Sequence, residues 1–136
     1  MAQKVTKVTM VRTRVPDQPG TAAQMAAALR ERGIGLKAVM GMRSGEGMAT
    51  LMCIPEKLSE LRALAAEEGL QIEESPMVWL EGPDEVGALC GFLNKVAAAG
   101  INIMAINALG VGGNFGAAFA FEDEQVVDRV IALTEG

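Results

Sequence analysis

Residues 10–20 read MVRTRVPDQPG, and residues 77–87 read MVWLEGPDEVG. When residues 10–69 are laid on residues 77–136 without a gap, 13 positions are identical. The identities include the proline, aspartate and glycine of the quoted stretch, which are residue types that form turns. Self-similarity at a fixed offset indicates that the chain contains two copies of one structural unit.

The pattern of apolar residues and turn residues predicts the same order of elements in both copies. In the first copy we expect a strand over 5–15, a helix from Thr21 to Gly33, strands over 34–42 and 47–54 joined by a hairpin at Arg43–Glu46, a helix ending at Gly69 and a strand over 70–74. In the second copy we expect a strand over 77–81, a helix over 88–99, strands over 101–109 and 115–121, and a helix over 123–134.

These elements predict an α+β protein made of two tandem ferredoxin-like βαββαβ modules with antiparallel sheets, residues 1–75 and 76–136. The second module lacks its last strand. In a split βαβ sheet the last strand lies beside the first, so the strand over 77–81 is left with an unpaired edge. We expect a segment of the neighbouring module or of a second subunit to pair with it.

Composition excludes several classes of protein. Half of the residues are apolar, and two cysteines are too few for a disulfide framework, so a folded protein of the cytoplasm is expected. Residues 1–54 carry eight basic and three acidic side chains, and residues 55–136 carry four and fourteen. The basic residues form no run and tyrosine is absent, which disfavours binding to nucleic acid. No signal peptide or membrane-spanning stretch is expected.

The residues also argue against an enzyme. Without histidine, the chain cannot form Ser/His or Cys/His nucleophile pairs or zinc sites with imidazole ligands, and we expect no metal and no cofactor. Residues 110–116, GVGGNFG, have the wrong spacing for a phosphate loop and join two strands, so they predict a hairpin. Cys53 and Cys90 are expected to be buried apolar residues.

The two strand–turn–helix joints are the best candidates for a binding site. Gly20 and Gly87 allow a ligand to approach the backbone, and the free amides of a helix start favour a carboxylate. The start of the following strand, with Asn102 and Ile103, would form the other side of the pocket. The simpler alternatives are that Asp17 and Asp84 cap the turns and that Asn102 is an ordinary turn residue.

These joints are where the chain resembles the ACT domain family, whose modules show a strand, D-x-P-G, a helix and a G-I-N-I strand start. Here the corresponding stretches are VPDQPG and GIGL in the first copy and GPDEVG and GINI in the second. The resemblance implies binding of a small amino acid at the interface between modules. The residues that it implies are Asp17, Gly20, Asp84, Gly87, Asn102 and Ile103.

The two copies depart from the family pattern in different ways. Gly35 stands at the asparagine position of the first copy, and Val86 stands at the proline position of the second. The resemblance therefore favours a composite site, in which the turn of one copy faces Asn102 of the other. It implies a non-catalytic regulatory protein that forms a homo-oligomer, expected to be a dimer, and acts on a metabolic enzyme. The alternative is a module that assembles with such an enzyme and binds no ligand.

Overall fold

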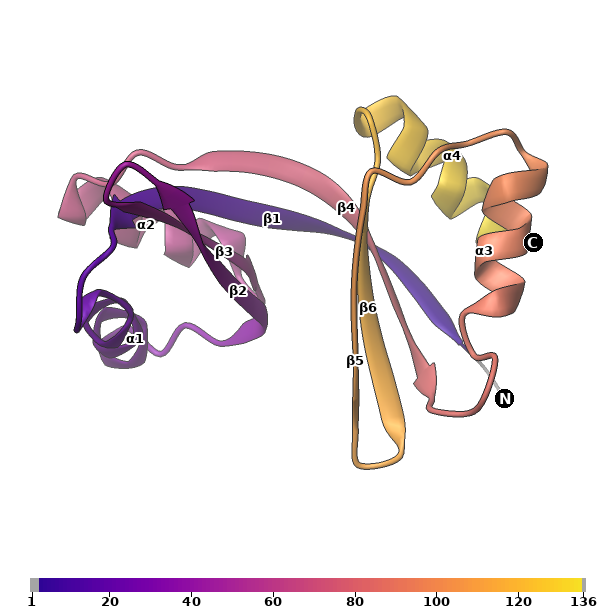
Figure 1. Cartoon of the computed structure of the whole chain (residues 1–136), viewed down its shortest axis with the longest axis horizontal. Helices are drawn as coiled ribbons and strands as arrows, with labels where there is room; N and C mark the ends of the chain where they lie inside the picture. Colours follow the sequence, from indigo (N-terminus) through magenta and orange to yellow (C-terminus); the bar gives the residue numbers. More distant parts are fainter. Residues whose placement is uncertain (1–2, 136) are drawn as a thin grey trace. The chain divides into compact units, whose positions relative to one another are not determined.

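The computed structural model describes residues 3–135 as an α+β fold with six strands and four helices (Figure 1). In chain order the elements are β1 (Lys4–Pro16), α1 (Thr21–Glu31), β2 (Leu36–Gly45), β3 (Met48–Pro55), α2 (Leu58–Glu68), β4 (Glu73–Pro83), α3 (Cys90–Ala98), β5 (Ala105–Val111), β6 (Asn114–Ala120) and α4 (Glu124–Glu135). Hydrogen bonds join the strands in the order β2-β3-β1-β4-β6-β5, and the sheet is antiparallel.

The chain divides into two compact units. One unit consists of residues 9–75, and the other consists of residues 3–8 together with 76–135. Two strands, β1 and β4, are long enough to contribute to both units. We expected residues 70–74 and 77–81 to form separate strands. Instead one strand begins at Glu73 and continues to Pro83, because Ser75 and Pro76 remain extended and do not form a turn.

The unit of residues 9–75 is built on the hairpin of β2 and β3, with β1 paired antiparallel to β3. Its core contains Val11 of β1, Ile34, and Leu61 and Leu64 of α2, with Leu29 of α1 packed against them. The leucines of α2 lie three residues apart and so face the sheet together. Thr13 is the buried polar residue of this unit, and its hydroxyl donates to the Gln71 carbonyl at 2.9 Å.

The second unit packs α3 and α4 on one face of the sheet formed by β4, β6 and β5 (Figure 1). Its core is formed by buried side chains from β4, β6, α3 and α4 and by the residue that follows β6: Val78, Leu80, Phe92, Val96, Phe115, Ala117, Phe119, Phe121, Val127 and Val130. The rings of Phe92 and Phe119 lie 4.6 Å apart between centroids. Alternate residues of β4 and β6 supply this core, as the period of a strand requires.

Residues 3–8 lie beside β4, in the place where a split βαβ sheet has its last strand. Val5 packs against its core, and the Cα of Gln3 lies 3.5 Å from where a Cβ on Gly82 would be. The start of β1 therefore runs beside β4, and the strand order within the unit is β1-β4-β6-β5. The sequence left open whether this partner strand comes from the neighbouring module or from a second subunit. The structure supports the neighbouring module, because the start of β1 belongs to the segment that we had assigned to that module.

Two local predictions are wrong in ways that matter for the site. The first hairpin turns at Glu46 and Gly47, both with positive φ, so Arg43 belongs to β2 and not to the turn. Asn102 and Ile103 precede β5 and are not part of a strand, because regular pairing begins only at Ala105. The second hairpin turns at Gly112 and Gly113, inside the range that the sequence predicts.

Candidate functional site

The turns after β1 and β4 have the same backbone construction. The Asp17 amide donates to the Gly47 carbonyl at 2.8 Å, and the Asp84 amide donates to the Gly113 carbonyl at 2.9 Å. Each turn then reaches a glycine with positive φ, 90° at Gly20 and 79° at Gly87. Such a conformation favours glycine, because a Cβ would crowd the backbone. Each aspartate is therefore held beside the β-hairpin of its own unit.

The two helices that follow these turns, α1 and α3, do not begin with side-chain caps. Gly20 is the N-cap of α1 and Leu89 is the N-cap of α3, and neither makes a side-chain cap hydrogen bond. The Thr21 hydroxyl donates back to the Pro16 carbonyl at 3.1 Å. Among residues 3–135, neither the Asp17 nor the Asp84 carboxylate accepts a hydrogen bond from a backbone amide, so the alternative that these aspartates cap the turns and helix starts is wrong.

The Asp17 carboxylate contacts a cation from its own unit. Arg43 Nε donates to Asp17 Oδ2 at 2.6 Å. Arg43 lies on β2 opposite Ala49, which is the second residue of β3 and is also paired with Val15 of β1. This ion pair links the turn after β1 to the neighbouring hairpin.

The Asp84 carboxylate has a different neighbour. At the position that corresponds to Arg43 the second copy has Gly110, which lies opposite Phe115, the second residue of β6. A Cβ built on Gly110 would lie 2.5 Å from Asp84 Oδ2, so the carboxylate rests against the bare backbone of β5. Among residues 3–135 the Asp84 carboxylate has no hydrogen-bond or ion-pair partner.

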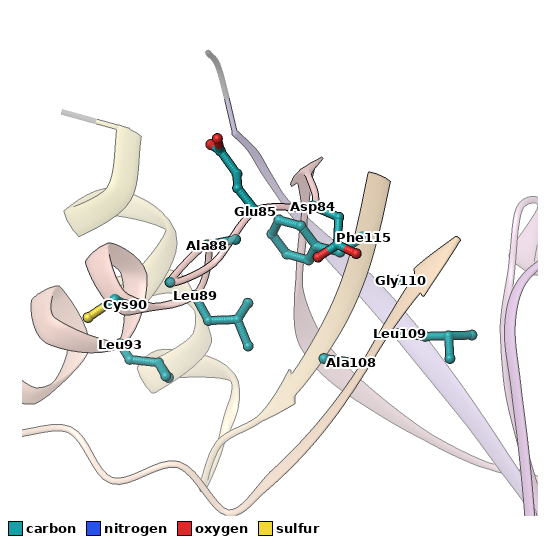
Figure 2. A pocket seen from close by; sticks show the side chains of 11 residues that line it. Asp84, Glu85, Ala88, Leu89, Cys90, Leu93, Ala108, Leu109, Gly110 and Phe115 are labelled. Atoms are coloured by element: carbon teal, nitrogen blue, oxygen red, sulfur yellow. The ribbon is translucent and has the colours of Figure 1, made fainter. Parts of the chain in front are cut away.

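A cavity of about 470 Å³ opens beside this carboxylate (Figure 2). It is lined by the turn, by the first residues of α3 and by the end of the β5–β6 hairpin: Asp84, Glu85, Gly87, Ala88, Leu89, Cys90, Leu93, Ala108, Leu109, Gly110 and Phe115. Figure 2 shows Leu89 and Leu93 projecting from the helix side, the Asp84 carboxylate directed toward β5 and the Glu85 carboxylate turned away. The cavity therefore combines apolar walls with one inward carboxylate.

The structure brings together some of the predicted site residues. Asp84 and Gly87 line this cavity, whereas Asp17 and Gly20 form the equivalent turn of the other unit. Asn102 is exposed and does not line the cavity, and Ile103 packs against the core. The far wall is formed by the end of β5, not by the residues before its start. A composite site that includes Asn102 stays a prediction.

Sequence reasoning missed the residues of β5 and α3 that complete the cavity. The signal for Gly110 was present in the repeat, where an arginine in one copy aligns with a glycine in the other, but it was hidden by placing Arg43 in a turn. Cys90 is exposed at the cavity, contrary to expectation, while Cys53 is half-buried and burial raises the pKa of its thiol. Within residues 3–135, no helix has the length and apolar character needed to cross a membrane.

Comparison with known proteins identifies the fold. No protein-family model matches the chain, and no curated protein sequence matches it. A crystal structure of a protein from Bacteroides thetaiotaomicron is similar with a TM-score of 0.82 at 14% identity, covering 96% of this chain and 88% of that one. The ligand-free regulatory subunit of aspartate kinase from Thermus thermophilus is similar with a TM-score of 0.60 at 21% identity, covering 97% and 96%.

The regulatory subunit of aspartate kinase from Thermus flavus gives a TM-score of 0.56 at 19% identity, covering 98% of this chain and 94% of that one. At these identities the likeness concerns the fold. Over nearly its whole length, this chain has a fold similar to that of aspartate kinase regulatory subunits.

Proposed function

We propose that this chain is a non-catalytic regulatory protein made of two ACT-like modules, and that it binds a small amino acid in the cavity between the β4–α3 turn and β5. The observation that carries the proposal is the Asp84 carboxylate, unpaired among residues 3–135, at a cavity with apolar walls. The similarity in fold to regulatory subunits of aspartate kinase supports a regulatory role over a catalytic one.

The dimensions and chemistry of the cavity support a small ligand. Its volume of about 470 Å³ lies within the ordinary range for ligand pockets, roughly 300–1,000 Å³. Apolar walls from Leu89, Leu93 and Phe115 would contact an aliphatic or aromatic part of the ligand, while Asp84 would orient its polar part. This pattern of mostly apolar lining with few polar groups is typical of specific small-molecule sites.

The position of the cavity suggests how binding would be transmitted. Its walls belong to a turn, a helix start and an edge hairpin, so a bound ligand would contact three elements at once. A ligand changes a conformational equilibrium by its difference in affinity for the two states. We expect the ligand to favour the arrangement in which β5 lies against the turn, and a metabolic enzyme to respond to that arrangement.

The alternative function is a ligand-free assembly module. Ile106, Leu109 and Val111 of β5 are exposed, and residues 101–121 contain no charged side chain. An uncharged edge strand with exposed apolar side chains favours pairing with another protein or with a second copy. A homodimer and a complex with a metabolic enzyme are both compatible with this surface.

A screen of the twenty amino acids against the full chain tests the proposed function. At a free ligand concentration one hundred times the dissociation constant, binding stabilises the folded state by about 2.7 kcal/mol, which a thermal-shift assay detects. We expect at least one amino acid to raise the melting temperature and to give a heat of binding by calorimetry. Asn102→Ala tests the composite site in the same assay, because it weakens binding only if Asn102 contacts the ligand.

The two functions give different results. If none of the twenty amino acids at millimolar concentration shifts the melting temperature of the parent protein or of Asn102→Ala, the regulatory binding function is wrong. Stoichiometric, ligand-independent capture of a metabolic enzyme would then favour the assembly module.

A further inference from the structure

The two copies of the repeat differ in the residue that faces the aspartate of the turn beside the candidate cavity. In the unit of residues 9–75, the carboxylate of the turn is paired with the guanidinium of Arg43. In the second unit the equivalent carboxylate is Asp84, and the equivalent strand residue is Gly110. The first unit thus shows which chemical group this arrangement of turn and hairpin accommodates.

The register of the strands confirms that the two positions are equivalent. Arg43 faces Ala49, which also pairs with Val15, while Gly110 faces Phe115, which also pairs with Gly82. Each aspartate follows the proline that ends its strand. The first hairpin has one more residue between Arg43 and the turn than the second hairpin has between Gly110 and its turn. An irregularity in the pairing of β2 between Arg43 and Gly45 accommodates this residue.

The surroundings of Asp84 leave its charge uncompensated. The unit of residues 3–8 and 76–135 contains four basic and eight acidic side chains. Of its basic residues, Lys7 pairs with Glu124 and Asp128 at 2.7 and 2.8 Å, and Arg129 donates to the Ala99 carbonyl. None of the residues that line the cavity is basic. Asp84 itself is exposed to solvent, so water screens part of its charge, and its attraction for a cation is that of a surface carboxylate with no protein partner among residues 3–135.

From these observations we propose that Asp84 receives a cationic nitrogen group of the ligand, a guanidinium or a primary ammonium, at the place that Arg43 fills in the other unit. The inference rests on the proposed function and specifies its ligand class. The hydrophobic remainder of the ligand packs on Leu89, Leu93 and Phe115. The turn of the first unit is closed to such a ligand by its own Arg43.

Isothermal titration calorimetry on the full chain tests the proposal, with L-arginine, L-lysine and the uncharged arginine analogue L-citrulline as probes. We expect at least one probe to bind the parent protein. Asp84→Asn keeps the shape of the side chain and removes its charge, so binding weakens about fivefold. If citrulline binds as well as arginine, the α-ammonium contacts Asp84; if it does not, the side-chain cation does.

Two further variants test whether binding depends on Asp84 at the cavity and not on Asp17 of the other unit. Gly110→Arg places a guanidinium beside Asp84, as Arg43 is placed beside Asp17, and we expect it to weaken binding at least tenfold. Asp17→Asn removes the paired carboxylate of the other unit, and binding should stay within twofold of the parent. Urea unfolding of each variant verifies that it is folded.

The outcomes distinguish this inference from the function on which it rests. Binding to Asp84→Asn and Gly110→Arg that stays within twofold of the parent would overturn the cation site, although the protein would still bind an amino acid. If the parent binds none of the three probes but binds another amino acid, that amino acid is titrated into Asp84→Asn, and binding within twofold of the parent overturns the cation site. If no amino acid binds the parent at all, both the cation site and the proposed function are wrong.

Discussion

Gly20 and Gly87 hold the two turns in a backbone conformation that other residues adopt only with strain. Each follows the aspartate of its turn by three residues and has a positive φ. A Cβ at either position would meet no heavy atom within 4 Å, so the requirement for glycine comes from the backbone and not from crowding. The position of Asp84 relative to the cavity therefore depends on Gly87.

Gly87→Ala should lower the free energy of unfolding by about 1–2 kcal/mol, which is the penalty for an alanine in the left-handed region. Gly91→Ala is the matched control, since Gly91 lies in α3 with open space around it and without a positive φ. Alanine there should stabilise the protein by about 0.5–1 kcal/mol. Urea unfolding measures both variants, and equal effects would contradict the assignment of strain to Gly87.

At the scale of elements, the first residues of β1 complete the sheet of a unit whose other elements come from residues 76–135. Val5 packs on the core of that unit, Gln3 Nε2 donates to the Ala88 carbonyl at 2.6 Å, and Lys7 pairs with α4. Ala88 also lines the candidate cavity. The start of the chain is therefore in direct contact with the turn that would hold a ligand.

Val5→Ala should destabilise the protein by about 1 kcal/mol, because it removes partly buried methyl groups from this contact. Lys4→Ala, at an exposed neighbouring position, should change the free energy of unfolding by less than about 0.5 kcal/mol. Hydrogen exchange of the β4 amides should also be faster in Val5→Ala. If the two variants are equally stable, residues 4–8 do not complete this sheet in solution.

A second element-scale contact predicts a dependence on pH. Arg62 of α2 donates two hydrogen bonds to the Glu74 carboxylate of β4, from Nε at 2.8 Å and from Nη2 at 2.7 Å. These hydrogen bonds lower the pKa of Glu74 below its ordinary value of 4.5. The unfolded chain therefore binds this proton more tightly, and the stabilisation is complete above about pH 4.5 and is lost as the pH falls through the lowered pKa.

Glu74→Gln should consequently be less stable than the parent at pH 6, and the difference should shrink toward pH 3. Glu68→Gln, at an exposed position of α2, should show no such change with pH. Thermal unfolding between pH 3 and pH 6 measures the three proteins. A difference between Glu74→Gln and the parent that stays constant across this range would contradict the proposed ion pair.

At the scale of the whole molecule, the sequence predicted the order of all ten elements. It divided one of them, β4, into two separate strands. Periodicity and turn residues identify elements because they reflect local backbone preference and burial on one face. The assignment of residues 4–8 to the second unit could not be predicted in the same way. It depends on contacts between residues such as Gln3 and Gly82, which lie far apart in the sequence.

The candidate site was predictable only in part, for a similar reason. Asp84 and Gly87 belong to a local motif that the sequence displays, whereas Gly110 and Leu109 reach the cavity through the register of the β5–β6 hairpin. The predicted first hairpin turn began at Arg43, whereas β2 continues to Gly45, so the prediction placed Arg43 outside its strand and concealed its ion pair with Asp17. The contrast between the paired and the unpaired aspartate thus required the structure.

The central claim is that an amino acid binds within the second unit, between the β4–α3 turn and β5. The most direct test is a two-dimensional ¹H–¹⁵N NMR titration of the full chain with the amino acid that gives the largest thermal shift. We expect the largest saturable chemical-shift changes at the amides of residues 84–93 and 108–110. Chemical-shift changes confined to residues 17–21, or no saturable chemical-shift change at residues 84–93, would contradict binding at this cavity.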